Sequence, residues 1–278
     1  MRRILDDRKG RGMKWYFAVN ETGLRHAWDQ IGIAVDSARR NTQLTPICLV
    51  DPGERDPEAR TRIAALARVG VAIIEHRASL FPIVKERHRL DSDMFSGHWL
   101  RCDIPLLDRS DETILYTDID VMFRHDPEPS LQPPAFLSCA PEHEQHDWSY
   151  FNSGVMLMNL PRLRATRDEL VRYVDANIGH MAPHDDQGAL NAVYRDRWDR
   201  LDLRCNWKPY WGFDGDATIL HFHGPKPGNV RDYQRDDDFA SRLEPGGFAD
   251  HQRALQGIYR RSPEGYAAYL AEADTYRI

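Results

Sequence analysis

The sequence predicts an α/β fold with a mostly parallel sheet that carries helices on its faces. Through the first half of the chain, short runs rich in β-branched and aromatic residues alternate with segments whose apolar residues recur at helical spacing. This alternation is typical of parallel strands joined by crossover helices. The length of 278 residues allows one large domain of this class or two small ones.

The predicted elements of the first half follow the chain in order. The first strand, KWYFAVN, is a short run of aromatic and β-branched residues. The second helix opens with Asp56-Pro57 and closes at Gly70, which are ordinary start and stop signals. The predicted strands cover 14–20, 44–51, 71–76 and 113–120. The predicted helices cover 22–39, 56–70 and 95–107.

The second half continues with strands and helices in a less regular order. Pro161 begins a strongly helical segment, a position that suits proline because its missing N–H is not needed there. The predicted strands cover 134–140, 153–160, 200–206 and 217–223. The predicted helices cover 161–178, a short segment after Asp185, and 251–269. Stretches rich in proline and glycine are interpreted as loops and not as a domain linker.

The balance of charge argues against a general affinity for nucleic acid. The chain has 37 lysines and arginines against 43 aspartates and glutamates, a formal net charge of −6. Nucleic-acid binding needs clustered positive charge. An anionic ligand would therefore have to bind through local lysines, local arginines or a metal ion.

The cysteines and the hydropathy pattern predict a cytoplasmic protein. The four cysteines lie far apart, which suggests neither a zinc knuckle nor a redox pair. No stretch approaches the roughly 20 apolar residues that a transmembrane segment needs. The first residues, MRRILDDRKGRG, lack the apolar core of a signal peptide. We expect residues 1–13 to be a mobile extension before a single domain over 14–278, and loose association with the inner membrane surface stays open.

The first candidate for a site lies at the end of the predicted strand 113–120. Asp118 and Asp120 stand one residue apart, and on an extended chain residues i and i+2 point to the same side. Two like charges at that spacing need a compensating cation, and oxygen ligands suit Mg²⁺, Mn²⁺ or Ca²⁺. A turn or helix-cap pair is the alternative, because aspartates are common after strands.

Three later stretches carry further polar candidates. Asn152 precedes Gly154 either in an ordinary β-turn or where a sugar ring approaches the backbone closely. Two aspartates before Gln187 exceed what one helix cap requires, so one of them can bind hydroxyl groups. His221 ends a strand and is followed by Lys226, a point charge suited to phosphate. A hydrogen-bonded structural histidine is the alternative for His221.

Taken in order, these stretches resemble the family 8 glycosyltransferases. That family's pattern is an apolar strand ending in D-x-D, then F-N-x-G-V with an apolar tail, then D-Q-x-x-L-N, then H-x-x-G-x-x-K-P. This chain has YTDIDV, FNSGVMLMNL, DQGALN and HFHGPKP. The resemblance spans about residues 14–228 and implies a GT-A-type, Rossmann-like fold with a mixed, mostly parallel sheet and helices on both faces. The first half would bind the nucleotide and the second half the acceptor, with a helical C-terminal tail.

The resemblance also implies the roles of individual residues. It makes Asp118, Asp120 and His221 the ligands of Mn²⁺, with Mg²⁺ as the alternative, and the mixed oxygen and imidazole set favours Mn²⁺ on ligand grounds too. Gln187 and Asp186 are implied for catalysis at the donor sugar. The residues implied for binding the donor are Ala18, Asn20, Thr22, Arg101, Asn152, Asp186, Gln187, Gly224 and Lys226.

Two departures from the family pattern concern the nucleotide. The family's usual aspartate for the uracil imide is Asn20 here, whose amide oxygen can still accept that proton. HFHGPKP is one residue shorter than the family motif, which affects the placement of Lys226. Two other stretches have open roles. Glu142–Trp148 is either a solvated loop or an acceptor-site loop, and the aromatic residues of 206–216 either stack on a sugar or pack.

The implied activity is transfer of a hexose from a UDP-sugar to a hydroxyl acceptor such as a glycan, with retention of the anomeric configuration. The implied partners are the donor and the acceptor, without nucleic acid. A protein that binds nucleotide-sugars or carbohydrates without catalysis is the alternative, and the intact metal set argues against it. The choice between glucose and galactose, the acceptor and the oligomeric state stay open.

Overall fold

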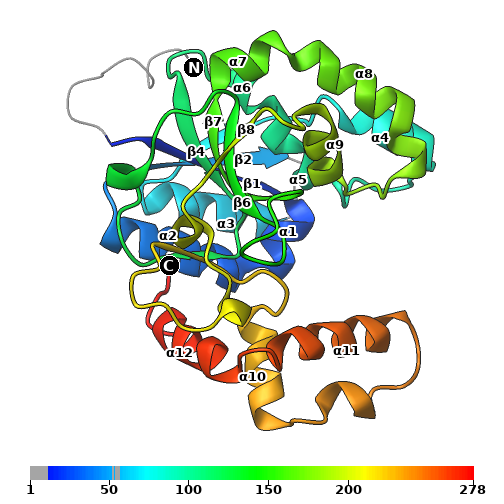
Figure 1. The fold of residues 1–278 in the computed structure, drawn as a ribbon. Coiled ribbons are helices and arrows are strands. Elements are labelled where there is room, and N and C mark those ends of the chain that lie inside the picture. Colours follow the sequence, from blue (N-terminus) through cyan, green and yellow to red (C-terminus); the bar gives the residue numbers. More distant parts are fainter. Residues whose placement is uncertain (1–11, 52, 54–56) are drawn as a thin grey trace.

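The structure is a computed structural model that describes residues 12–51, 53 and 57–278 (Figure 1). Residues 1–11 of the predicted N-terminal extension lie outside the described residues. Within the described part, no helix combines the length and the apolar character that crossing a bilayer requires. All four cysteines are buried and unpaired.

A seven-stranded sheet in the order β3-β2-β1-β4-β7-β6-β8 forms the centre of the fold. The strands β1 to β4 are parallel, and β7 is antiparallel to both of its neighbours, β4 and β6. Since β8 is parallel to β6, only β7 opposes the common direction within this sheet of the described residues. The strands are β1 Lys14–Asn20, β2 Thr45–Asp51, β3 Ala72–Glu75, β4 Thr113–Thr117, β6 Leu137–Pro141, β7 Phe151–Asn159 and β8 Trp198–Arg200. The predicted mixed, mostly parallel sheet is confirmed.

Helices cover both faces of this sheet, and each face has its own hydrophobic core (Figure 1). On β1 the side chain of Tyr16 packs on one face and those of Trp15 and Phe17 on the other, as the alternation of a strand requires. The helices on the side of Trp15 are α1 Glu21–His26, α2 Trp28–Asn41 and α3 Pro57–Arg68. Those on the side of Tyr16 are α4 Phe81–His88, α5 Ser96–Trp99, α6 Ile104–Leu107, α7 Leu160–Ala165, α8 Arg167–Asn177 and α9 Asp186–Val193.

A small second sheet and a group of C-terminal helices complete the fold. β5 Val121–Phe123 pairs antiparallel with β9 Ile219–His221, so that Val121 lies opposite His221. The C-terminal helices are α10 Pro227–Arg235, α11 Gly247–Tyr259 and α12 Pro263–Ala273. Figure 1 shows them, orange to red, on the side of the molecule away from α7 and α8. Short 3₁₀ turns lie at 100–103, 128–130, 178–180, 203–206, 209–211 and 239–242.

Several predicted helices are interrupted in the structure, and at two of the breaks a side chain bonds a backbone carbonyl of the helix. The hydroxyl of Thr166 bonds the Arg162 carbonyl at 3.0 Å, where α7 ends and α8 begins. The first predicted helix divides at Ala27, and Arg62 there takes the Arg25 carbonyl at 2.6 Å, which a continuous helix would have used. The interrupted predictions are 22–39, 95–107, 161–178 and 251–269.

The predicted strand 200–206 is wrong. β8 ends at Arg200, and residues 203–206 form a 3₁₀ turn. The carboxylate of Asp202 accepts a hydrogen bond from the Arg204 backbone N–H at 2.9 Å and so starts this turn. Such local bonds offer the backbone an alternative to a strand ladder. The helices α4 and α10 lie where no element is predicted.

Candidate active site

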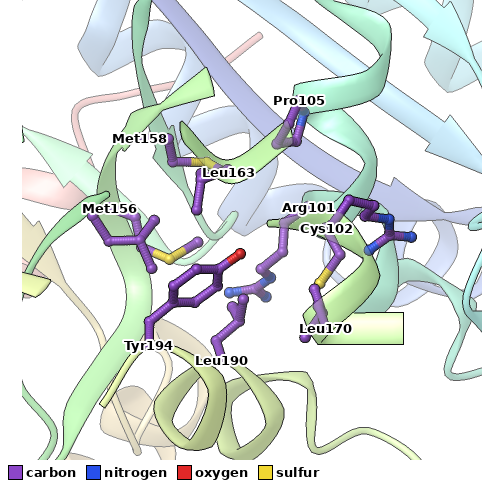
Figure 2. A pocket seen from close by; sticks show the side chains of 11 residues that line it. Arg101, Cys102, Pro105, Met156, Met158, Leu163, Leu170, Leu190 and Tyr194 are labelled. Atoms are coloured by element: carbon purple, nitrogen blue, oxygen red, sulfur yellow. The ribbon is translucent and has the colours of Figure 1, made fainter. Parts of the chain in front are cut away.

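A narrow cavity lies between β7 and the helices α7 to α9 (Figure 2). Figure 2 shows Met156, Leu190 and Tyr194 around it, with Arg101 at one side. Its volume is about 20 Å³, which is room for roughly one water molecule. A sugar or a nucleotide therefore does not fit there.

A larger pocket of about 590 Å³ includes residues at the carboxyl ends of β1 and β4. Ligands of open α/β sheets bind at this end of the strands. Most residues predicted for the site line this pocket: Ala18, Asn20, Arg101, Asp118, Asp120, Asn152, Asp186, Gln187, His221 and Lys226. Thr22 lines an adjoining pocket instead, and Gly224 is outside the lining of both.

Asp118 and Asp120 lie in a bend between β4 and β5. The expectation that an extended strand aligns their side chains is wrong, because β4 ends at Thr117. The Asp118 N–H bonds the Gly154 carbonyl at 2.7 Å. The carboxylates converge all the same, since together with His221 they offer ligand atoms that lie within 4.8 Å of one another. The bend thus brings together the three side chains that are predicted to bind metal.

Each of these two carboxylates is paired with a cation of the chain. The Arg101 guanidinium donates to Asp118 Oδ1 at 2.6 Å, and the Lys226 ammonium donates to Asp120 Oδ2. Burial disfavours the charged form of Asp120, but Lys226 and His221 outweigh burial and hold the pKa of Asp120 well below its usual range. The repulsion between the two carboxylates is therefore compensated within the protein.

The donor set of the cluster fits a divalent cation. His221 is 2% exposed, and its Nδ1 faces Asn206 Oδ1 at 3.0 Å while its Nε2 faces Asp120 Oδ1 at 3.4 Å. An imidazole nitrogen beside two carboxylates suits Mn²⁺, whereas Mg²⁺ prefers oxygen ligands alone. Asp118, Asp120 and His221 are the residues that would hold such an ion.

Gly154 lets the ring of His221 pack against the backbone of β7. A Cβ at Gly154 would lie 2.3 Å from His221 Cε1 and 2.9 Å from Asn152 Oδ1. Both are closer than Cβ atoms approach other heavy atoms in proteins. The close approach that the sequence indicates at this glycine is made by a side chain of the protein, so two of the four motifs interlock here.

The start of α9 separates the roles of two adjacent aspartates. Asp185 caps the helix, because its Oδ1 accepts a hydrogen bond from the Gly188 N–H at 2.8 Å. Asp186 is buried, and its Oδ2 lies 3.0 Å from Arg101 Nε without the geometry of a hydrogen bond. Burial raises the pKa of Asp186 to about 7, against the lowering effect of Arg101. Asp186 therefore lies beside Arg101 in the lining of the pocket, and its role in catalysis stays a prediction.

Gln187 and Asn152 both bond to Glu142, which was not among the predicted site residues. Gln187 Nε2 donates to Glu142 Oε2 at 2.9 Å, and Asn152 Nδ2 donates to the same oxygen at 2.8 Å. Glu142 Oε1 lies 3.0 Å from His223 Nε2. Burial disfavours the carboxylate, but His223 and Asn152 outweigh burial and lower the pKa of Glu142 to about 2. Glu142 lines the pocket, so the loop 142–148 is not solvated throughout.

Three side chains of the segment 208–211 hold the start of this loop. Lys208, Tyr210 and Trp211 donate, in that order, to the backbone carbonyls of residues 141–143, at 2.7, 3.2 and 2.7 Å. We call these three bonds the carbonyl clamp. The Lys208 ammonium also lies 4.3 Å above the Trp211 ring. These aromatic residues therefore pack and bond within the protein.

Asn20 lies at the expected end of β1, with its side chain already bonded. Its Oδ1 accepts a hydrogen bond from the Gly23 N–H at 2.8 Å and caps α1. Its Nδ2 donates to the Met94 carbonyl at 2.7 Å. An amide oxygen has two lone pairs, so Oδ1 can accept a second bond. Its contact with a uracil imide stays a prediction.

The overall structure is a GT-A fold, shared with known glycosyltransferases. The apo form of the glycosyltransferase GlyE from Streptococcus pneumoniae TIGR4 is 17% identical with a TM-score of 0.58, over 96% of this chain and 64% of GlyE. The galactosyltransferase LgtC, in complex with donor and acceptor sugar analogs, is 19% identical with a TM-score of 0.58, over 88% of this chain and 95% of LgtC. Mouse xyloside xylosyltransferase 1 is 16% identical with a TM-score of 0.52, over 77% of this chain and 98% of its own.

The sequence points to a family within this fold. Residues 138–227 match the model of glycosyl transferase family 8, a segment that includes Gln187, His221 and Lys226. Asp118 and Asp120 precede this segment. No curated protein matches the chain by sequence. The predicted resemblance to this family is confirmed over residues 138–227, which hold three of the four motifs, and the fold and the family match together support a glycosyltransferase.

Proposed function

We propose that the protein is a retaining, metal-dependent glycosyltransferase that moves a hexose, glucose or galactose, from a UDP-sugar to a hydroxyl of a glycan or other acceptor. The observation that carries this proposal is the convergence of Asp118, Asp120 and His221 in a pocket that Arg101 and Lys226 also line. A metal site flanked by two cations suits a diphosphate. We propose Mn²⁺ as the metal, with Mg²⁺ as the alternative.

The proposed placement of the substrates follows the course of the chain through one domain, 14–278. The nucleotide would lie against the first half, where Ala18 and Asn20 line the pocket. The acceptor would lie against the second half, near Glu142 and His223. The buried, unpaired cysteines fit a reducing compartment, and we propose a cytoplasmic location.

Departure of the nucleoside diphosphate is the step that the cations of the chain serve. A metal ion at the cluster, when bound, supplies positive charge that offsets the charge developing on the diphosphate. Lys226 adds a point charge, and Arg101 presents a guanidinium that Asp118 and Asp186 hold in place. Charges that are already oriented stabilise the leaving group well because they need not reorganise.

Retention is proposed from the residues near the donor sugar. Gln187 is a neutral amide and a weak nucleophile, and the carboxylate of Glu142 is engaged by Asn152, Gln187 and His223. We therefore propose that the acceptor hydroxyl attacks from the side of the leaving group. The bond from C1 to the phosphate oxygen breaks, a C1–O bond to the acceptor forms on the same face, and the hydroxyl proton passes to the leaving phosphate.

The proposal is tested with a panel of UDP-hexoses in Mn²⁺ and in EDTA. We expect release of UDP in Mn²⁺ for at least one donor, and a loss of about three orders of magnitude in EDTA, since a metal contributes several kcal/mol to such a step. NMR of the product should show an α linkage from an α-linked donor. A β linkage would refute retention. Tight UDP-sugar binding without turnover, across a panel of acceptors, would favour the non-catalytic alternative.

Lys226 should contribute to the affinity for UDP and not to the affinity for the metal ion. The Lys226 ammonium donates to Asp120 Oδ2, so it competes with a metal ion for the negative charge of this carboxylate. We expect Lys226→Met to leave the affinity for Mn²⁺ alone unchanged or raised. UDP affinity in Mn²⁺ should fall about tenfold, because a charge-assisted hydrogen bond contributes about 1.5–3 kcal/mol. Calorimetry measures both constants.

The matched control is Arg231→Met, which removes a cation of α10 that pairs with Asp274 and is not among the residues that line this pocket. It should change neither constant. If Lys226→Met weakened Mn²⁺ and UDP equally, the proposed competition at Asp120 would be wrong.

A further inference from the structure

A line of buried amide side chains connects Glu142 to His221. Asn152 Nδ2 donates to Glu142 Oε2 at 2.8 Å, and Asn152 Oδ1 accepts from Asn206 Nδ2 at 2.9 Å. Asn206 Oδ1 in turn lies 3.0 Å from His221 Nδ1. Asn152, Asn206 and His221 are at most 3% exposed, so solvent does not compete for these bonds.

The Glu142 carboxylate determines which group donates and which accepts in every bond of this line. An ionised carboxylate only accepts hydrogen bonds, so Asn152 has to turn its NH₂ group toward Glu142. Asn152 Oδ1 then accepts from Asn206 Nδ2 and from the Gly154 N–H, the latter at 3.0 Å. With its NH₂ group directed to Asn152, Asn206 can present only its oxygen to His221.

The consequence for His221 is a defined tautomer. Only a protonated Nδ1 can bond the Asn206 oxygen, so in the neutral ring Nε2 carries a lone pair. In the neutral ring that lone pair faces Asp120 Oδ1 at 3.4 Å, so a metal ion between the two atoms would bind both.

We infer that Asn206 is a positioning residue that fixes His221 as the Nδ1–H tautomer and so presents Nε2 to a metal ion. The role of the metal rests on the proposed function, whereas the tautomer rests on the hydrogen bonds alone. Partners that hold the second nitrogen of a metal-binding histidine fix its ring orientation, and their loss costs about 10–100-fold in metal affinity. Asn206 is two residues away from the segment that forms the carbonyl clamp and was not among the predicted site residues.

The first measurement is the tautomer of His221 in metal-free protein, from the ¹⁵N shifts of the ring nitrogens. We expect the Nδ1–H form in the wild type. In Asn206→Ala the ring loses this constraint, and we expect a mixture in which Nε2–H donates to Asp120. A wild-type ring in the Nε2–H form would overturn the inference whether or not any variant folds.

The second measurement is the affinity for Mn²⁺ alone, followed by electron paramagnetic resonance. Asn206→Ala should weaken Mn²⁺ binding about 10–100-fold. Asn206→Asp should restore most of that affinity, because aspartate accepts the Nδ1–H bond in either protonation state. Asn206→Ala and Asn206→Asp both lose the bond to Asn152, so both should melt at a lower temperature than the wild type. If Asn206 had a purely structural role, the two variants would not differ in Mn²⁺ affinity.

The control is Asn159→Ala. Asn159 is at the end of β7 away from Asn152, and its side chain caps α7 and donates to the Pro134 carbonyl. It should lower stability and change neither the tautomer nor the Mn²⁺ affinity. If Asn206→Ala behaved like this control, the inference would be wrong. A wild type that shows the Nδ1–H tautomer but binds no Mn²⁺ would refute the proposed function and the metal role of Asn206 while leaving the tautomer assignment standing.

Discussion

Asp120→Asn is expected to lower the rate of glycosyl transfer about a thousandfold, equivalent to about 4 kcal/mol of transition-state stabilisation. The substitution keeps the shape of the side chain and removes its charge. Asp120 is the carboxylate of the cluster that contacts both His221 and Lys226. A neutral amide is a poor ligand for a divalent cation, so the affinity for Mn²⁺ should fall with the rate.

The fold should survive this substitution, which separates the effect from simple unfolding. The ammonium of Lys226 is about a third exposed and can be hydrated when its partner loses charge. We expect the melting temperature of metal-free protein to change by only a few degrees, as for a loss of about 1 kcal/mol. Mn²⁺ affinity from paramagnetic resonance and UDP release from a coupled assay are the two readouts.

Asp36→Asn provides the control for loss of a buried carboxylate elsewhere. Asp36 is 3% exposed and accepts a hydrogen bond from the Arg277 N–H at 3.0 Å, outside the residues that line the pocket. This variant should lose stability and keep both Mn²⁺ affinity and activity. Normal Mn²⁺ affinity in Asp120→Asn would exclude the cluster as the metal site.

Gly154→Ala is expected to damage the site through shape alone. The added methyl group would lie 2.3 Å from His221 Cε1, and the ring cannot swing away freely because Asn206 holds Nδ1. Either the ring or β7 has to move, at a cost of about 1–3 kcal/mol of unfolding free energy. A displaced His221 should also weaken Mn²⁺ binding, by about a hundredfold if the ring no longer points at the cluster.

Thermal unfolding and Mn²⁺ titration together test this prediction. The matched change is Gly179→Ala, where a Cβ would meet no atom within 4 Å and the backbone has no positive φ. Gly179→Ala should be close to neutral in both measurements. If Gly154→Ala bound Mn²⁺ normally and melted with the wild type, the contact between β7 and His221 would not matter for the site.

The strands of the main sheet could be predicted from sequence where they are short, apolar and buried on both faces. The first strand is correct to the residue, because every side chain of KWYFAVN lies on one core or the other or at a strand end. The break at Ala27 could not be predicted, since it involves a bond from the side chain of Arg62, far away in the sequence. Periodicity measures only which face is apolar, and it continues across such a break.

The residues of the candidate site likewise fall into those that the sequence predicted and those that it did not. Its predicted metal ligands converge, because the motifs name the residue types and the topology of the sheet brings their strand ends together. Glu142 and Asn206 were missed because each acts through partners about 10 to 80 positions away, and neither spacing forms a pattern. One signal was available for Glu142, which lies two residues beyond the carboxyl end of the predicted strand 134–140.

The carbonyl clamp has a consequence for anyone who exchanges the loop 142–148, which we propose lies near the acceptor. Loops are usually exchanged between relatives as single segments. The conformation of the loop 142–148 depends on two segments, because side chains of 208–211 bond the carbonyls of 141–143. An insertion of one residue in either segment would shift the donor side chains relative to the carbonyls that accept their bonds. The side chain of Glu142 would then point in a different direction. A loop taken from a relative should therefore keep its conformation only when the relative's segment equivalent to 208–211 is transferred together with it.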